Sequence, residues 1–136
     1  YKLAEEKNLL DIIEFKGWVE DKEEFYKEID IFCLPSLQES IGTTLLEAFL
    51  YSLPVVTSDT EGPIEIARPY FDCLMFQTGD SKSMATSLMR LIQDIPFAER
   101  LGKQALNTVI SRFDINIVGK QLVSCLEQVI FKHQEQ

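Results

Sequence analysis

Positive charge and histidine are both scarce in this sequence of 136 residues. Lysine and arginine together number 13, against 22 aspartates and glutamates, and the formal net charge is -9. This charge repels phosphate backbones and argues against nucleic acid as a partner, although backbone N–H groups in a local pocket can still hold a small anion. The one histidine, His133, stands in the polar tail KHQEQ, so we expect a solvated side chain and no catalytic histidine.

Long apolar runs are also missing. No stretch approaches the roughly 18 uninterrupted apolar residues that indicate a membrane-spanning helix. The first ten residues are partly acidic where a signal peptide is basic, and they lack a starting methionine, which we interpret as a fragment or a trimmed protein. Cys33, Cys73 and Cys125 are far apart and lie in apolar stretches. We therefore predict buried free thiols in a reducing compartment, not a disulfide or a metal site.

Short apolar runs alternate with helical patterns along the chain. The runs predict strands at 11–15, 29–36, 53–59 and 72–76. The periodic segments predict helices at 21–29, 42–52, 81–94, 96–111 and 114–132, and a short helix within 62–67 whose first helical residue is Pro63. Within each run, apolar and polar residues do not alternate, so we expect strands buried on both faces. The order predicts one α/β domain over 1–136, a three-layer sandwich with a mostly parallel sheet.

The stretch ESIGTTLLE, residues 39–47, joins a predicted strand to a predicted helix. In parallel sheets, ligands bind beyond the carboxyl ends of the strands, where this loop is expected. Gly42 allows unusual backbone angles and close approach of a ligand, and the free N–H groups of the first helical turn favour an anion. Glu39 in the loop and Glu47 on the helix can border one pocket and accept hydrogen bonds from vicinal hydroxyls.

Carboxylates beside an anion-binding helix start suit a nucleotide sugar, and the hydroxyls of Thr43 and Thr44 add hydrogen-bond donors. Plainer interpretations remain open at this point. A glutamate such as Glu47 on an amphipathic helix is often only solvated. Glu39 is also consistent with a loop carboxylate that stabilises the dipole of the helix start.

A longer ordered pattern surrounds this stretch. From residue 30 to residue 66 the sequence carries, in order, Asp30, Pro35-Ser36, Glu39, Gly42, Glu47-Ala48, Leu53-Pro54-Val55-Val56, Gly62 and Glu65. This order and spacing resemble the donor-binding region of group-1, family-4 type, retaining glycosyltransferases. The flanking segments, 3–30 and 81–113, also resemble the family, so the likeness covers nearly all of the chain.

The resemblance implies a GT-B fold of two Rossmann-like halves, of which this chain is an incomplete C-terminal, nucleotide-sugar-binding half. It implies that Glu39, the candidate catalytic residue, contacts hydroxyls of the transferred sugar, and that Glu47 accepts hydrogen bonds from the ribose. The donor would be a UDP- or GDP-sugar, bound without a metal or other cofactor. It also implies that backbone amides contact the sugar and diphosphate, namely those of Ser40, Ile41, Gly42, Thr43 and Thr44. The base would lie near the turn formed by Gly17, Trp18 and Val19.

Parts of the family pattern are missing from the chain. The first strands of this half, the basic pair that follows them and the acceptor-binding half are absent, and Lys16 and Lys22 are expected to be solvated surface residues. Ser52 and Glu61 stand where the family often has glycine. Without those strands we expect a gap or unpaired edges in the sheet, with completion by another chain or a longer native protein. The apolar stripe of 114–132 predicts core packing, with an interdomain face as the alternative.

The resemblance implies transfer of a sugar, with retention, to a glycan or lipid-linked acceptor in polysaccharide or lipopolysaccharide biosynthesis. The chain alone would bind the donor and be inactive, in the cytoplasm or at the inner face of the membrane. One alternative is a non-catalytic nucleotide-sugar-binding or interaction domain of the same fold. Another is an unrelated α/β domain for a different phosphate ligand, which the lack of G-x-G-x-x-G and P-loop patterns disfavours.

Overall fold

A parallel sheet lies at the centre of the computed structural model, which describes the backbone of residues 1–134 and the side chains of residues 1–130. The strand order is β1 (Phe32–Leu34), β2 (Val55–Ser58) and β3 (Leu74–Phe76), and both neighbouring pairs are parallel. The helices are α1 (Lys2–Glu6), α2 (Lys22–Glu28), α3 (Thr43–Leu50), α4 (Glu61–Ile66), α5 (Ser81–Gln93), α6 (Ile95–Arg112) and α7 (Ile115–Gln134). The expected solvation of His133 lies outside the described side chains.

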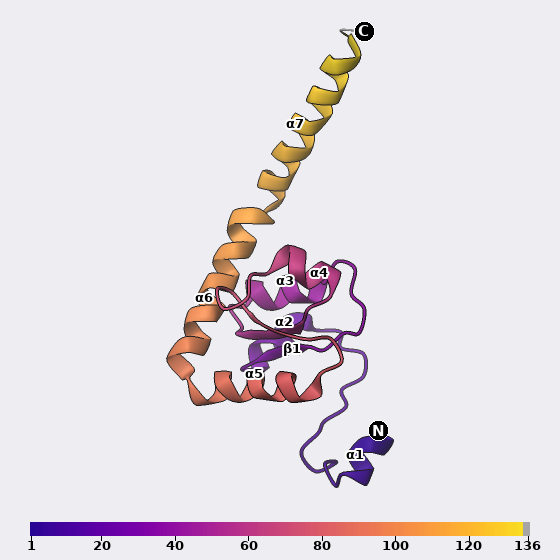
Figure 1. Ribbon diagram of the computed structural model, residues 1–136, viewed down its shortest axis with the longest axis vertical. Helices are drawn as coiled ribbons and strands as arrows, with labels where there is room; N and C mark the ends of the chain where they lie inside the picture. The colour runs from indigo at the N-terminus through magenta and orange to yellow at the C-terminus, as the bar shows by residue number, and fades with distance from the viewer. Residues whose placement is uncertain (135–136) are drawn as a thin grey trace.

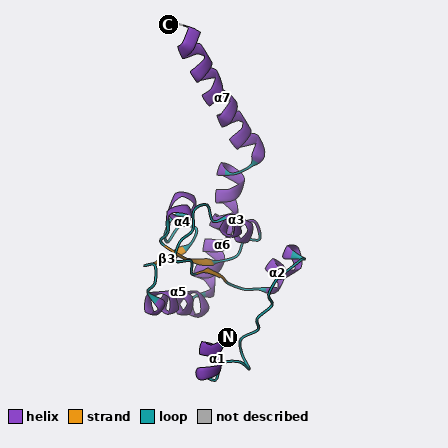
Figure 2. Cartoon of the chain, turned by 90° about the vertical axis from the view of Figure 1, so that its right-hand side faces the viewer, coloured by secondary structure: helices purple, strands orange, loops and turns teal. Residues whose placement is uncertain are grey.

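Helices cover both faces of this sheet. Val55 and Val56 of β2 point to opposite faces, because successive side chains of a strand alternate. Val55 packs in a cluster with residues of α3 and α4, and Val56 packs in a second cluster with Leu91 of α5 and Leu101 of α6. Figures 1 and 2 show α3 and α4 on one side of the strands and α5 on the other. The predicted three-layer α/β architecture with a parallel sheet is confirmed.

Aspartate side chains mark where several helices begin. Asp21, Asp80 and Asp94 accept backbone N–H groups from the first turns of α2, α5 and α6, respectively. These contacts satisfy amides that have no acceptor within the helix. Pro63 is the third residue of α4, so its expected place as the first residue is wrong. Proline fits the third position because that N–H also needs no intrahelical acceptor.

The N-terminal segment departs from the predicted order. Residues 8–20 contain neither helix nor strand, so the strand expected at 11–15 is wrong. Ile12 and Phe15 are exposed, and Figures 1 and 2 show α1 beyond this segment, away from the sheet. A strand is stable only beside a hydrogen-bonded neighbour. Within the described residues β1 pairs with β2 alone, which leaves the expected unpaired edge.

The last helix is also placed differently from its prediction. Figures 1 and 2 show that α7 follows α6 and extends away from the sheet and the helices that cover it. Its described apolar side chains are mostly exposed, namely Ile115, Val118, Leu122, Val123, Leu126, Val129 and Ile130. The core packing predicted for this stripe is therefore wrong, because the described part of the structure places no other element alongside the helix.

All three cysteines are free thiols, as predicted, but they are not all buried. Cys73 is buried in the core and Cys33 is half-buried on β1. Cys125 is exposed, since it lies on α7 beyond the body of the fold. None of the helices in the described part of the chain combines the length and the apolarity needed to cross a membrane.

Candidate functional site

The start of α3 presents free backbone amides. Gly42 caps the helix with a φ of 71°, in the left-handed region that glycine adopts without strain. Its N–H donates to Oε1 of Glu39 at 3.2 Å. Among the hydrogen bonds of the described residues, none uses the N–H groups of Thr43 and Thr44. Both amides lie at the positive end of the helix dipole and are available to an anion.

The loop that carries Glu39 lies directly on the start of α4. The Gly62 N–H donates to the Glu39 carbonyl at 2.9 Å. A Cβ at Gly62 would lie 2.8 Å from backbone atoms of Ile41, so a larger residue would push the two segments apart. Two elements of the sequence pattern that are distant along the chain are thus in contact, and Gly62 is required by this close approach.

Glu47, on the second turn of α3, has two defined partners from α2. Its Oε2 accepts a hydrogen bond from the Tyr26 hydroxyl at 2.9 Å. Its Oε1 pairs with Nζ of Lys22 at 2.8 Å. Glu47 is therefore more than a solvated helical residue, and Lys22, although exposed as expected, is paired. No pattern along the chain indicates either contact.

These contacts favour the ionised form of the Glu47 carboxyl. The hydrogen bond from Lys22, assisted by that from Tyr26, holds the pKa of Glu47 below its ordinary value, although burial acts in the opposite direction. Burial first, and then the hydrogen bond to Glu47, raises the pKa of the Tyr26 phenol. At neutral pH Tyr26 is therefore a neutral donor and Glu47 a charged acceptor, which is the state that accepts hydrogen bonds from ligand hydroxyls.

A cleft of about 260 Å³ opens between the loops that follow β1 and β2. Its lining is rich in hydrogen-bond acceptors and comprises Leu37, Gln38, Glu39, Ser40, Asp59, Thr60 and Glu61. The Thr78 hydroxyl and N–H each donate to Asp59 at 2.7 Å, and these bonds lower the pKa of the Asp59 carboxyl. The Thr60 hydroxyl is buried and has no hydrogen-bond partner among the described residues. Such a lining suits the hydroxyls of a ligand.

The contributions of Asp59 and Thr60 to this cleft were missed in the sequence. The signal that could have found them is their position directly after β2, because the carboxyl ends of parallel strands meet at one edge of the sheet. Glu61, which departs from the family pattern, lines the same cleft.

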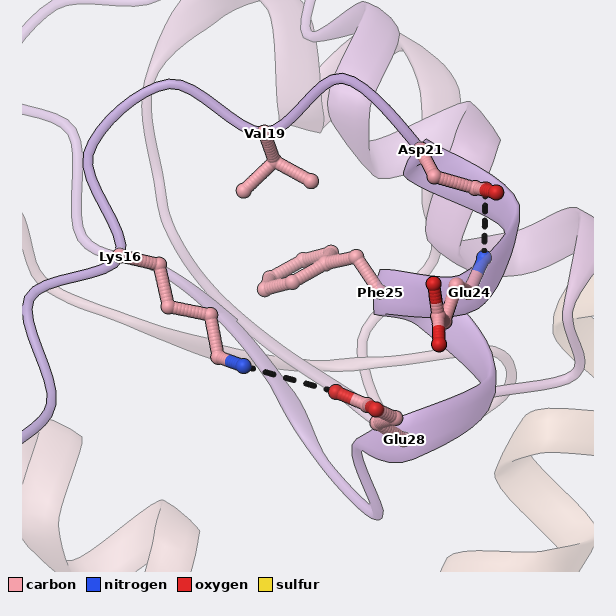
Figure 3. A pocket seen from close by; sticks show the side chains of 6 residues that line it. All are labelled: Lys16, Val19, Asp21, Glu24, Phe25 and Glu28. Atoms are coloured by element: carbon pink, nitrogen blue, oxygen red, sulfur yellow. Dashed lines mark hydrogen bonds and ion pairs between the residues drawn. The ribbon is translucent and has the colours of Figure 1, made fainter.

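The turn expected near a base borders a second cleft, of about 320 Å³. Val19 faces Phe25 of α2 across this cleft, and Lys16 reaches Glu28 at 3.5 Å (Figure 3). Gly17 has a φ of 64° and Trp18 is 87% exposed, and neither lines the cleft. Of the three residues expected to contact a base, the structure thus brings Val19 alone to the cleft.

The predicted site residues are joined through α2 and α3. Glu39 and Gly42 are in direct contact before α3, and Glu47 lies on the same helix. Helix α2 lies between them and the turn at 17–19, since it lines the same cleft as Val19 and also carries the two partners of Glu47. Within the described residues, no three His, Cys, Asp or Glu side chains are grouped in a way that would hold a metal ion.

Comparison with known sequences gives the family. The sequence profile described as "Glycosyl transferases group 1" matches residues 1–108. The chain is 30% identical over 131 residues to the lipopolysaccharide core biosynthesis glycosyltransferase LpsD of Rhizobium meliloti, which covers 96% of this chain and 38% of LpsD. It is 28% identical over 113 residues to LpsE of the same organism, covering 83% of this chain and 33% of LpsE. The chain spans about a third of the length of these relatives.

Comparison with solved structures gives the fold. HepE of Anabaena, in complex with UDP, superposes with a TM-score of 0.88 at 21% identity, covering 93% of this chain and 35% of HepE. The C-terminal domain of LpcC, a glycosyl transferase group 1 family protein of Francisella tularensis, superposes with a TM-score of 0.75 at 22% identity, covering 84% of this chain and 60% of that domain. The fold matches the C-terminal half of GT-B glycosyltransferases, and the chain belongs to the group 1 glycosyltransferase family.

Proposed function

We propose that this chain is the donor-binding part of a retaining glycosyltransferase, which transfers a sugar from a UDP- or GDP-sugar to a glycan or lipid-linked acceptor. The names of its relatives support polysaccharide or lipopolysaccharide biosynthesis as the setting. Two are named for the lipopolysaccharide core, and one from Campylobacter jejuni is named for N-acetylgalactosamine transfer to a diphospho-undecaprenol substrate. The free thiols suit a reducing compartment, so we place the enzyme in the cytoplasm, with a lipid-linked acceptor bringing it to the inner membrane face.

One observation carries this proposal: two free amides at the start of α3 lie between two carboxylates along the chain. We assign the sugar and diphosphate to the amides of 40–44, the hydroxyls of the transferred sugar to Glu39, and the ribose hydroxyls to Glu47. Oε1 of Glu39 already accepts the Gly42 N–H, which stabilises the helix start. No described residue donates to its Oε2, and a carboxylate accepts several hydrogen bonds at once. The base is assigned to the turn at 17–19.

The chemistry follows from the charge that develops when the sugar leaves the diphosphate. As that bond breaks, negative charge accumulates on the departing phosphate oxygen, and fixed helix-start amides stabilise it. The cleft beside these amides is acidic, with Glu39, Asp59 and Glu61 in its lining. We therefore assign the cationic groups and the acceptor site to segments outside this chain, and expect no transfer by the chain alone. The same segments, or another chain, would pair with the open edge of β1.

The acidic cleft also favours a second candidate function. A domain that keeps the nucleotide-sugar site but lacks cationic stabilisation of the leaving group would bind the donor without turning it over. The two functions separate in an assay of the longest natural protein that carries this sequence. Release of UDP from UDP-glucose, or of GDP from GDP-mannose, in the presence of an acceptor extract supports the enzyme. Binding without release supports the second candidate.

Titration calorimetry with UDP-glucose and GDP-mannose tests the donor site itself. We expect one of the two to bind, and expect Glu47→Ala to weaken that binding about tenfold, because hydrogen bonds to a charged acceptor are lost. Glu127→Ala, which removes an exposed carboxylate from α7, is the matched control and should bind like the wild type. Absence of binding to either donor, or unchanged affinity in Glu47→Ala, contradicts the proposal.

A further inference from the structure

The two oxygens of Glu47 are held in different ways. We propose that Tyr26 is a positioning residue that fixes Glu47 for the ribose, and that Lys22 is an exchangeable partner whose place a ribose hydroxyl takes. This inference rests on the proposed function, in which Glu47 accepts the ribose hydroxyls. We assign neither Tyr26 nor Lys22 a contact with the nucleotide. Both residues act through Glu47.

Tyr26 is fixed by the core of the protein. Its side chain is buried, its ring is stacked on Tyr51 with centroids 5.2 Å apart, and it lies 5.8 Å from the ring of Phe32. The hydroxyl at the end of this ring donates to Oε2 of Glu47 at 2.9 Å. Because the ring cannot swing without disturbing the core, the position of that carboxylate oxygen is set by packing rather than by solvent.

Lys22 is held far less firmly. It is the first residue of α2, and its side chain is 62% exposed where it meets Oε1 of Glu47 at 2.8 Å. Exposed ion pairs contribute little to stability, since both groups are well solvated when apart. A ligand hydroxyl can therefore replace the Lys22 ammonium on Oε1, while Tyr26 keeps Oε2 in place. The carboxylate is then aimed at the ribose before the ligand arrives.

The readout for this inference is discrimination between ribose and dideoxyribose. We define the ribose discrimination factor as the Kd for a 2′,3′-dideoxynucleoside diphosphate divided by the Kd for the matching ribonucleoside diphosphate. The ligand pairs are UDP with 2′,3′-dideoxy-UDP, and GDP with 2′,3′-dideoxy-GDP. Any general attraction between Lys22 and phosphate affects both members of a pair equally and cancels in the factor.

Removing the Tyr26 hydroxyl should lower this factor. Tyr26→Phe keeps the buried ring and is expected to reduce the factor about fivefold, mainly by weakening binding of the ribonucleotide. Tyr51→Phe is the matched control, because it removes a hydroxyl from the stacked neighbour, for which no hydrogen bond to Glu47 is found among the described residues. An unchanged factor in Tyr26→Phe, or an equal loss in Tyr51→Phe, overturns the positioning role.

Removing the Lys22 ammonium should act in the opposite direction. Lys22→Met keeps a long side chain on an exposed position, so the fold is retained, and it leaves Oε1 unoccupied. The factor is expected to rise about threefold, because the ribose no longer displaces an ion pair. An unchanged or lower factor in Lys22→Met overturns the exchange. If Tyr26, Lys22 and Glu47 had only a structural role, the two variants would not change the ribose discrimination factor in opposite directions.

The wild type and Glu47→Ala separate this inference from the proposed function. If the wild type binds neither diphosphate, or if Glu47→Ala keeps the full discrimination factor, the proposed role of Glu47 fails and the inference falls with it. If discrimination is present in the wild type and lost in Glu47→Ala, but Tyr26→Phe and Lys22→Met match the wild type, the proposed function stands and only the inference is overturned.

Discussion

Helices α6 and α7 are consecutive and both carry apolar stripes, yet only α6 is covered. Leu101 and Ala105 of α6 are fully buried, whereas Leu122 and Leu126 of α7 are 60% and 53% exposed. Figure 1 shows α6 beside the sheet and its covering helices, and α7 beyond them. Helical periodicity therefore identifies a face that needs cover, but the rest of the fold decides whether cover is present.

The largest expected difference between the two helices comes from leucine truncation. Leu101→Ala removes a fully buried side chain from the cluster around Val56 and should lower the free energy of unfolding by about 3 kcal/mol. Leu122→Ala removes an exposed side chain and should change it by less than about 0.5 kcal/mol. Urea denaturation followed by circular dichroism measures both. Similar losses in the two variants would mean that α7 is packed in solution.

Replacement of glycine by alanine should have opposite effects in the two helices, destabilising in α6 and favourable to helix formation in α7. A Cβ at Gly102 would overlap the backbone carbonyl oxygen of Ser52, so Gly102→Ala should destabilise the protein by about 2 kcal/mol despite the better helix propensity of alanine. A Cβ at Gly119 meets no atom within 4 Å. Gly119→Ala should therefore raise helix content, measured by circular dichroism, without lowering the unfolding midpoint. A loss of stability in Gly119→Ala would show that Gly119 is packed against another part of the protein.

The smallest expected difference lies at the helix starts. The Asp94 carboxylate accepts the Phe97 N–H in the first turn of α6 at 3.0 Å, and the Asp114 carboxylate accepts the Asn116 N–H in the first turn of α7 at 2.8 Å. Asp94→Ala should lower the unfolding free energy by about 1 kcal/mol, because it removes a cap from a helix that packs on the core. Asp114→Ala should leave the unfolding midpoint in place and only reduce helix content. Equal shifts of the midpoint would show that α7 unfolds together with the body.

The sequence predicts the body of this fold because each element there has a local signal. β2 begins with the apolar pair Val55-Val56 and is buried along its length, and α5 and α6 follow aspartate caps and carry clear apolar stripes. The strand expected at 11–15 has a strand-like composition, but a strand also needs a neighbour, which composition does not supply. The predicted burial of Cys125 and of the α7 stripe is wrong for the same reason, since a side chain is buried only where a second surface covers it.

The candidate site divides along the same line. Gly42 and the free amides of α3 follow from the change of strand to helix around a glycine, which is local. The contacts of Glu47 with Tyr26 and Lys22 join α3 to α2 and depend on how these helices dock, so no pattern along the chain indicates them. The place of the buried Thr60 hydroxyl in the cleft likewise depends on how the loops after β1 and β2 lie against each other, which the sequence pattern does not indicate.

The central proposal is that the free amides at the start of α3 bind the diphosphate of a nucleotide sugar. The most direct measurement is an NMR titration of the nitrogen-15-labelled protein with UDP, and in parallel with GDP, following the amide resonances of Thr43 and Thr44. The predicted result is that these amides show the largest shifts with one of the two nucleotides. Binding of that nucleotide with Thr43 and Thr44 unmoved, and with the shifts confined to other segments, would contradict it.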